Sequence, residues 1–119
     1  MSLTVYGIPT CDSVRNARTH LDLAGIEYTF VDLRANPPSR AQIEAWISTL
    51  GALRLRNTSG RAFRQLGPEK TSFTDAQWAE AYAQDPMLLK RPIIERDGAP
   101  LMVGFKDPEA GLALIRAKG

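Results

Sequence analysis

The first half of the chain is organised by residues 3–33, which read LTVYGIPTCDSVRNARTHLDLAGIEYTFVDL. Leu3–Gly7 is rich in strand-forming residues and ends in glycine, which predicts a short strand. Apolar residues then recur at helical spacing, which predicts an amphipathic helix over residues 12–24; they are Val14, Ala17, Leu21 and Ala24. Gly25 follows as the expected C-terminal cap, and residues 28–33 form a second predicted strand. A strand, a helix and a strand within about thirty residues are typical of a right-handed parallel crossover.

Residues 39–89 are expected to be mostly helical. Two capping boxes mark helix starts at Ser39 with Gln42 and at Thr74 with Gln77. They predict helices over residues 40–50 and 75–84, whose large apolar residues should be buried: Ile43, Trp46, Ile47, Leu50, Trp78 and Tyr82. Short helical turns and a loop are expected between Leu53 and Leu66, with a stop at Gly67–Pro68.

The last part of the chain predicts a hairpin and a closing helix. Asp97-Gly98 lies between two apolar runs, Pro92–Arg96 and Ala99–Gly104, which is the strongest local signal for a hairpin. Asp107 is expected to cap the final helix and Pro108 to occupy its first position. The apolar residues predicted for this helix are Leu112, Leu114 and Ile115.

The order of these elements predicts the fold class. A strand, helix and strand come first, and two strands and a helix come last, with a mostly helical segment of about fifty residues between them. This order is that of an α/β, thioredoxin-like fold, in which the βαβ and ββα halves form one four-stranded mixed sheet. We therefore expect a single domain over residues 1–119 with a helical insertion at about 39–89.

Composition excludes several classes of protein. The chain has 119 residues, 44% hydrophobic and 24% charged, which is typical of a globular domain. One cysteine and one histidine exclude an internal disulfide, a Cys-X-X-Cys pair and a Cys/His zinc finger, and we expect no metal site. A net charge of +2 does not indicate direct binding to nucleic acid. Without a membrane span or a signal peptide, we expect a cytoplasmic monomer whose thiol stays reduced.

The lone cysteine, Cys11, lies one residue before the first predicted helix. A helix N-terminus favours an anion, so this position lowers the pKa of the thiol, whereas the neighbouring carboxylate of Asp12 raises it. Most single cysteines are small buried hydrophobes, but Cys11 lies in a polar loop away from the apolar face of the helix. Position alone leaves a reactive thiol and an inert one as alternatives.

Several motifs, in order, resemble the arsenate reductase (ArsC)/Spx family over nearly the whole chain. They are Tyr6-Gly7-Ile8-Pro9-Thr10-Cys11, Arg15-Asn16, Asn36-Pro37-Pro38-Ser39-Arg40, Leu55-Arg56-Asn57, Phe63-Arg64-Gln65-Leu66, Lys90-Arg91-Pro92-Ile93 and Val103-Gly104-Phe105. Each motif is weak alone, but their order and spacing are characteristic. The resemblance is greatest to a less characterised bacterial branch, thought to reduce thiols with glutathione.

The resemblance implies a role for each site residue. Cys11 would be the nucleophile, and Arg91, followed by a cis Pro92, would bind an oxyanion or glutathione beside it. A second arginine comes from the insertion in this family, and Arg56 matches it best, with Arg61 as the rival. Thr10 and Pro92 complete the implied site. Lys106 stands near the place of a third arginine, and a lysine cannot bind an anion through two parallel N–H groups.

The leading hypothesis is a monothiol reductase without a bound cofactor. Cys11 would attack a glutathione mixed disulfide, and glutathione or glutaredoxin would resolve the intermediate because the chain has no second thiol. A glutaredoxin-coupled arsenate reductase is an alternative, but Val14 replaces the serine that family arsenate reductases carry near the cysteine. Another alternative is a Spx-like regulator that binds a protein such as RNA polymerase, although Val14 also takes the place of the second cysteine in the switch of those regulators.

Overall fold

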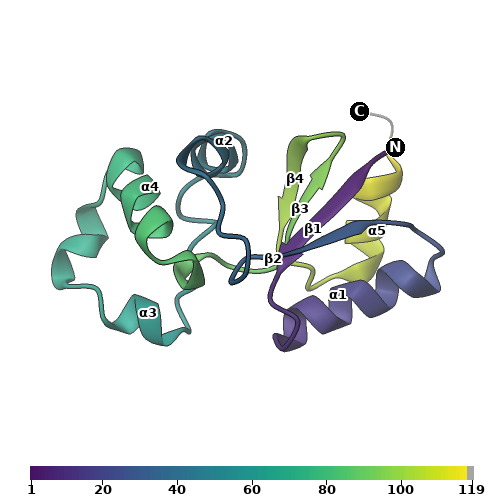
Figure 1. Ribbon diagram of the computed structural model, residues 1–119, viewed down its shortest axis with the longest axis horizontal. Coiled ribbons are helices and arrows are strands. Elements are labelled where there is room, and N and C mark those ends of the chain that lie inside the picture. Colours follow the sequence, from purple (N-terminus) through teal and green to yellow (C-terminus); the bar gives the residue numbers. More distant parts are fainter. Residues whose placement is uncertain (118–119) are drawn as a thin grey trace. The chain divides into compact units, whose positions relative to one another are not determined.

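The computed structural model describes residues 1–117. The chain forms two compact units, one made of Met1–Asp32 with the segment that starts at Arg91, the other of Leu33–Lys90. The first contains the sheet and the second consists of helices and turns (Figure 1). Among residues 1–117 no helix combines the length and apolar character that a membrane crossing requires.

The sheet of the first unit has four strands in the order β2-β1-β3-β4. They are β1 (Leu3–Gly7), β2 (Thr29–Asp32), β3 (Ile93–Arg96) and β4 (Ala99–Val103). β1 pairs with β2 in parallel and with β3 antiparallel, and β3 pairs antiparallel with β4. The sheet is therefore mixed. Asp97 and Gly98 turn the hairpin with φ of 54° and 80°, as the sequence predicts for this turn.

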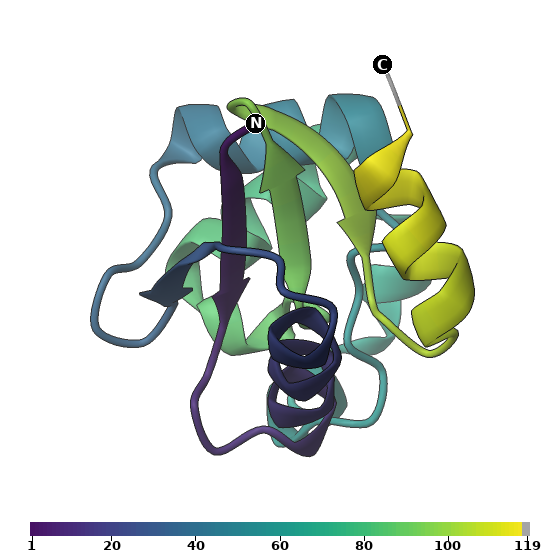
Figure 2. The same ribbon diagram turned by 90° about the vertical axis from the view of Figure 1, so that its right-hand side faces the viewer.

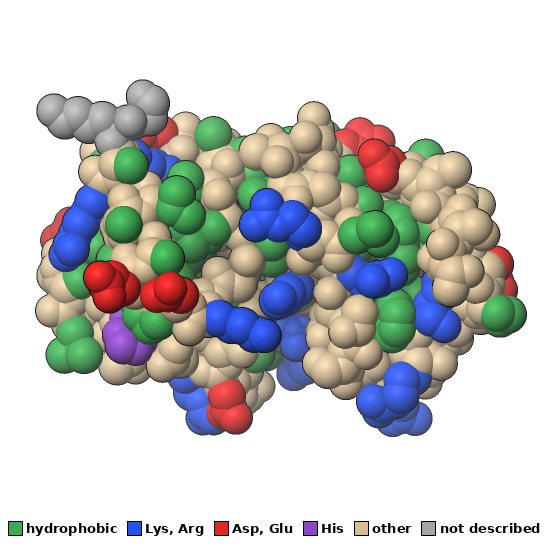
Figure 3. Space-filling view, turned by 180° about the vertical axis from the view of Figure 1, so that it is seen from behind, with side chains coloured by type: hydrophobic (Ala, Val, Ile, Leu, Met, Phe, Trp, Pro, Cys, Tyr) green, Lys and Arg blue, Asp and Glu red, His purple; other side chains and the backbone are tan. Residues whose placement is uncertain are grey.

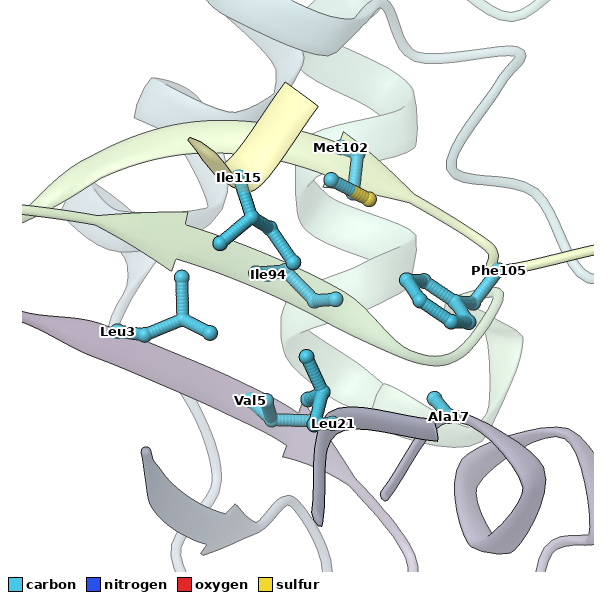
Figure 4. Packing of buried hydrophobic residues seen from close by; sticks show 8 residues of the cluster. All are labelled: Leu3, Val5, Ala17, Leu21, Ile94, Met102, Phe105 and Ile115. Atoms are coloured by element: carbon cyan, nitrogen blue, oxygen red, sulfur yellow. The ribbon is translucent and has the colours of Figure 1, made fainter. Parts of the chain in front are cut away.

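Helices α1 (Asp12–Leu23) and α5 (Pro108–Arg116) cover one face of this sheet (Figure 2). Alternate strand residues point at them, so strands and helices share one apolar core. Figure 4 shows its buried members, which are Leu3, Val5, Ala17, Leu21, Ile94, Met102, Phe105 and Ile115. This core anchors α1, the helix that begins one residue after the lone cysteine.

The second unit is built on two packed helices, α2 (Arg40–Leu50) and α4 (Asp75–Gln84). The shorter elements are α3 (Arg61–Arg64), η1 (Pro68–Ser72) and η2 (Pro86–Leu88). Ser39 Oγ accepts from the N–H of Gln42, and Thr74 with Gln77 forms the full predicted capping box. The aromatic residues of these helices are fully buried, as predicted; they are Trp46, Trp78 and Tyr82.

The α/β class, the mixed four-stranded sheet and the helical character of the insertion agree with the sequence prediction, but two details differ. The turn before Gly67 stops as predicted, since α3 ends at Arg64, but Pro68 then opens η1, which was not predicted; proline suits the first position of a helix. Leu114 was expected on the apolar face of α5 but is 50% exposed. The buried residues of α5 are Gly111 and Ile115, four apart, and this register turns Leu114 outward.

Candidate active site

Cys11 occupies the N-cap position of α1. Its backbone is extended, with φ −77° and ψ 127°, as expected for a residue just outside a helix. Its N–H donates to the carbonyl of Ile8 at 3.0 Å, and its carbonyl accepts from the N–H of Arg15 at 2.9 Å. Backbone bonds on both sides therefore fix this residue between β1 and α1, as its position in the sequence predicts.

The pairing of β1 with β3 brings Arg91 to the same edge of the sheet. Tyr6, near the end of β1, is opposite Ile93, the first residue of β3. Because the two strands are antiparallel, the loop after β1 and the segment before β3 are neighbours. The half-buried Arg91 hydrogen-bonds the Cys11 side chain, and the Arg91–Pro92 peptide bond is cis.

The pKa of the Cys11 thiol lies below its usual value as the net result of opposing effects. Partial burial raises the pKa, because it disfavours the charged form. Hydrogen bonding from the backbone of Val14, from the Arg91 side chain and from the backbone of Ser13 lowers it, and so does the charge of Arg91. The Cys11 side chain does not cap α1 with a hydrogen bond, so the N–H groups of Ser13 and Val14 lower the pKa by stabilising the thiolate.

Three other predicted site residues lie on the same edge of this unit. Thr10 is exposed and precedes Cys11 directly. Pro92 is buried, and its carbonyl accepts from the N–H of Gly104 at 2.8 Å, which holds the end of β4 beside the start of β3. Lys106 is exposed in the loop that leaves β4 after Gly104. The topology alone explains why residues so far apart in sequence gather at this edge.

Arg56 and Arg61 belong to the second unit. The backbone of Arg56 pairs with that of Leu89 in an isolated antiparallel β-bridge. Its guanidinium carbon lies 5.5 Å from the ring centre of Phe63 and 5.8 Å from that of Trp78. Its buried Nε has no hydrogen-bond partner within residues 1–117. Arg61 is exposed at the start of α3. Basic side chains, blue in Figure 3, lie over this unit, which also carries Arg54 and Arg64 in its sequence.

The backbone donors of Ser13 and Val14 are the contributors to the site that residue types did not reveal. Every residue except proline carries an N–H, so no side-chain pattern marks them. The signal in the sequence was the N-cap position of Cys11, because a cap faces the free N–H groups two and three residues on. In the described part of the chain, no three residues of the types His, Cys, Asp and Glu lie close enough to hold a metal ion.

Known proteins resemble this chain over most of its length. The arsenate reductase of Rhizobium meliloti is 37% identical over 97 residues, which cover 79% of this chain and 69% of that protein. The uncharacterized protein YusI of Bacillus subtilis is 34% identical over 113 residues, or 92% of this chain and 95% of its own. The solved YFFB protein superimposes with a TM-score of 0.86 at 32% identity, over 96% of this chain and 99% of its own.

The family assignment rests on a family model that matches most of this chain. A model of the ArsC family matches residues 6–111, a range that includes Cys11, the insertion, Arg91 and the hairpin. The mixed sheet and its helices are those of the thioredoxin-like fold that this family shares. The chain belongs to the ArsC family, whose members include arsenate reductases.

Proposed function

We propose that this protein is a monothiol reductase with Cys11 as its nucleophile and glutathione as its co-substrate. The observation that carries the proposal is the environment of Cys11, where an arginine side chain and backbone donors lower the thiol pKa. The thiolate is the nucleophilic form of cysteine, so this environment raises its reactivity at neutral pH. Family membership and the arsenate reductase relatives support a reductase.

The proposed reaction exchanges disulfides in two steps. The Cys11 thiolate attacks the glutathione sulfur of a mixed disulfide, forming a bond between Cys11 and glutathione and releasing the substrate thiolate, which takes up a proton. A second glutathione thiolate then attacks the sulfur of the bound glutathione, releases glutathione disulfide and restores the Cys11 thiolate. One glutathione is consumed for each mixed disulfide reduced. Glutaredoxin is the alternative resolving partner, since the chain has no second cysteine.

The other site residues receive proposed roles in binding the anionic co-substrate. Arg91 holds a carboxylate of glutathione and stabilises the Cys11 thiolate, and Thr10 and Pro92 border that position. Lys106 adds a positive charge on the same sheet edge. Arg56 and Arg61 remain the candidates for a second anion-binding arginine. The proposed organisation is one domain over residues 1–119 with the insertion at about 39–89.

Turnover of a glutathione mixed disulfide tests the proposal. Wild type is expected to consume glutathione in the presence of the disulfide, and Cys11→Ser to reduce the rate to that of the uncatalysed reaction. Equal rates for the two proteins would refute the role of Cys11.

Arsenate is the second candidate substrate, because the relative from Rhizobium meliloti is an arsenate reductase. The same assay with arsenate and glutaredoxin in place of the disulfide separates the two functions. Turnover of arsenate alone would replace the proposal, whereas turnover of the mixed disulfide alone supports it.

A further inference from the structure

The end of β1 and the first turn of α1 approach each other more closely than side chains normally allow. A Cβ atom built on Gly7 would lie 2.6 Å from Cγ2 of Val14 and 2.9 Å from its Cγ1. Real Cβ atoms essentially never come within 3.0 Å of a heavy atom outside their own and the neighbouring residues, so no residue except glycine fits at position 7 without movement. Gly7 does not have a positive φ, so close approach rather than backbone conformation explains the glycine.

Val14 fills the space that Gly7 leaves. Its side chain is 0% exposed, although it lies in the first turn of a surface helix. Val14 is also the third residue after Cys11, and its backbone N–H lowers the pKa of the Cys11 thiol. One residue therefore joins the strand through its side chain and the thiol through its N–H. The depth at which Val14 packs on Gly7 sets how the first turn of α1 is placed.

The backbone N–H groups and the arginine that act on the Cys11 sulfur are held by different secondary-structure elements. The N–H donors belong to α1, whereas Arg91 is placed by the pairing of β3 with β1. A shift of the first turn away from β1 moves the sulfur with the helix but leaves Arg91 with the sheet. The contact between Gly7 and Val14 thus controls the geometry between the thiol and its arginine.

We propose that Gly7 and Val14 are positioning residues for Cys11, which seat the first turn of α1 against the end of β1 and so hold the thiol beside Arg91. The inference rests on the proposed function only in taking Cys11 as the reactive group. A valine in place of the hydroxyl residue expected from related enzymes then has a physical reason, because the side chain at this position is buried against the strand.

The test measures how alkylation of Cys11 by iodoacetamide depends on pH, using the folded full-length protein. Gly7→Ala is expected to displace the first turn, raise the pH midpoint of alkylation and lower the rate at neutral pH several-fold. Val14→Ala in the same protein removes two methyl groups where one has been added, and so is expected to bring the midpoint back toward that of wild type. Circular dichroism establishes that each variant is folded.

Gly111→Ala supplies a matched control in the same unit. A Cβ on Gly111 would lie 2.4 Å from Cε2 of Phe105, so the substitution crowds the core of α5 to a similar degree. It is expected to lower stability and leave the alkylation midpoint unchanged. If Gly7→Ala does not fold, Val14→Ala alone loosens the same contact and is expected to raise the midpoint to a smaller extent.

Two results would overturn the inference. The first is a folded Gly7→Ala variant that keeps the wild-type alkylation midpoint; if Gly7→Ala does not fold, the same result for Val14→Ala counts. The second is a Gly111→Ala variant that shifts the midpoint as far as Gly7→Ala does. Alkylation needs no substrate, so its outcome is independent of turnover. A wild-type protein that reduces no mixed disulfide would refute the proposed function and leave the positioning of the thiol to be judged by these midpoints.

Discussion

Replacing Tyr82 by phenylalanine tests the buried hydrogen bond that joins α4 to the segment just after α2. The Tyr82 hydroxyl donates to the carbonyl of Ala52 at 2.6 Å, and both residues are buried, with exposed fractions of 0% and 6%. Phenylalanine keeps the ring and its stacking on Trp78, whose centre lies 5.5 Å away. The substitution therefore removes one hydroxyl and leaves the hydrophobic packing of the second unit in place.

The expected loss of stability follows from the acceptor that is left behind. A buried carbonyl without its donor costs about 1–3 kcal/mol. For a chain of this length each kcal/mol lowers the melting temperature by about 3–6 °C. Urea denaturation followed by circular dichroism measures the change as a lower midpoint with an unchanged slope. Tyr28→Phe is the matched control, because its half-buried hydroxyl accepts from Arg18 Nε at 3.0 Å where water can replace it, and should cost about 0.5 kcal/mol or less.

The pH dependence of folding stability gives a second test of Tyr82. Burial raises the pKa of Tyr82 far above that of a free tyrosine, although the charge of Arg56 acts in the opposite direction. Since the folded-state pKa is the higher one, the stability contributed by the neutral hydroxyl is complete below about pH 10 and is lost as the pH rises above it. The stability difference between wild type and Tyr82→Phe should therefore shrink above that pH. Equal urea midpoints at neutral pH, or a difference that grows in alkali, would contradict the reasoning.

Two further substitutions test the core and the site of the first unit. Leu21→Ala should lower the free energy of unfolding by about 2–5 kcal/mol, because Leu21 is fully buried between α1 and the sheet. Its control is Leu23→Ala, which changes a side chain that is 81% exposed and should alter the free energy by less than about 0.5 kcal/mol. Urea denaturation measures both variants, and similar losses of stability would contradict the packing. Arg91→Ala should raise the pKa of Cys11, since Arg91 lowers it through a hydrogen bond and through its charge. Alkylation of Cys11 should then require a higher pH than in wild type or in the exposed control Arg116→Ala. An unchanged pH dependence of alkylation would remove Arg91 from this role.

Local sequence patterns predicted most of the secondary structure because their causes are local. The capping box of Thr74, the turn at Asp97-Gly98 and the proline that opens α5 act within four residues. The same reasoning placed Cys11 at a helix start, since a cap depends only on its neighbours in the chain. It was wrong where a choice depended on packing: Leu114 has the apolar character of a core residue, but the register of α5 on the sheet exposes it.

The sequence by itself determined the order of the elements and the place of the thiol before the first helix. Only the tertiary structure showed that Arg91 hydrogen-bonds Cys11, because the two lie eighty residues apart and meet through the antiparallel pairing of β1 with β3. Only the tertiary structure likewise showed Val14 packed on Gly7, since the distance between a strand end and a helix turn is set by how the helix lies on the sheet. Local propensities act along the chain, whereas the pKa of a thiol depends on every charge and donor that folding brings near it.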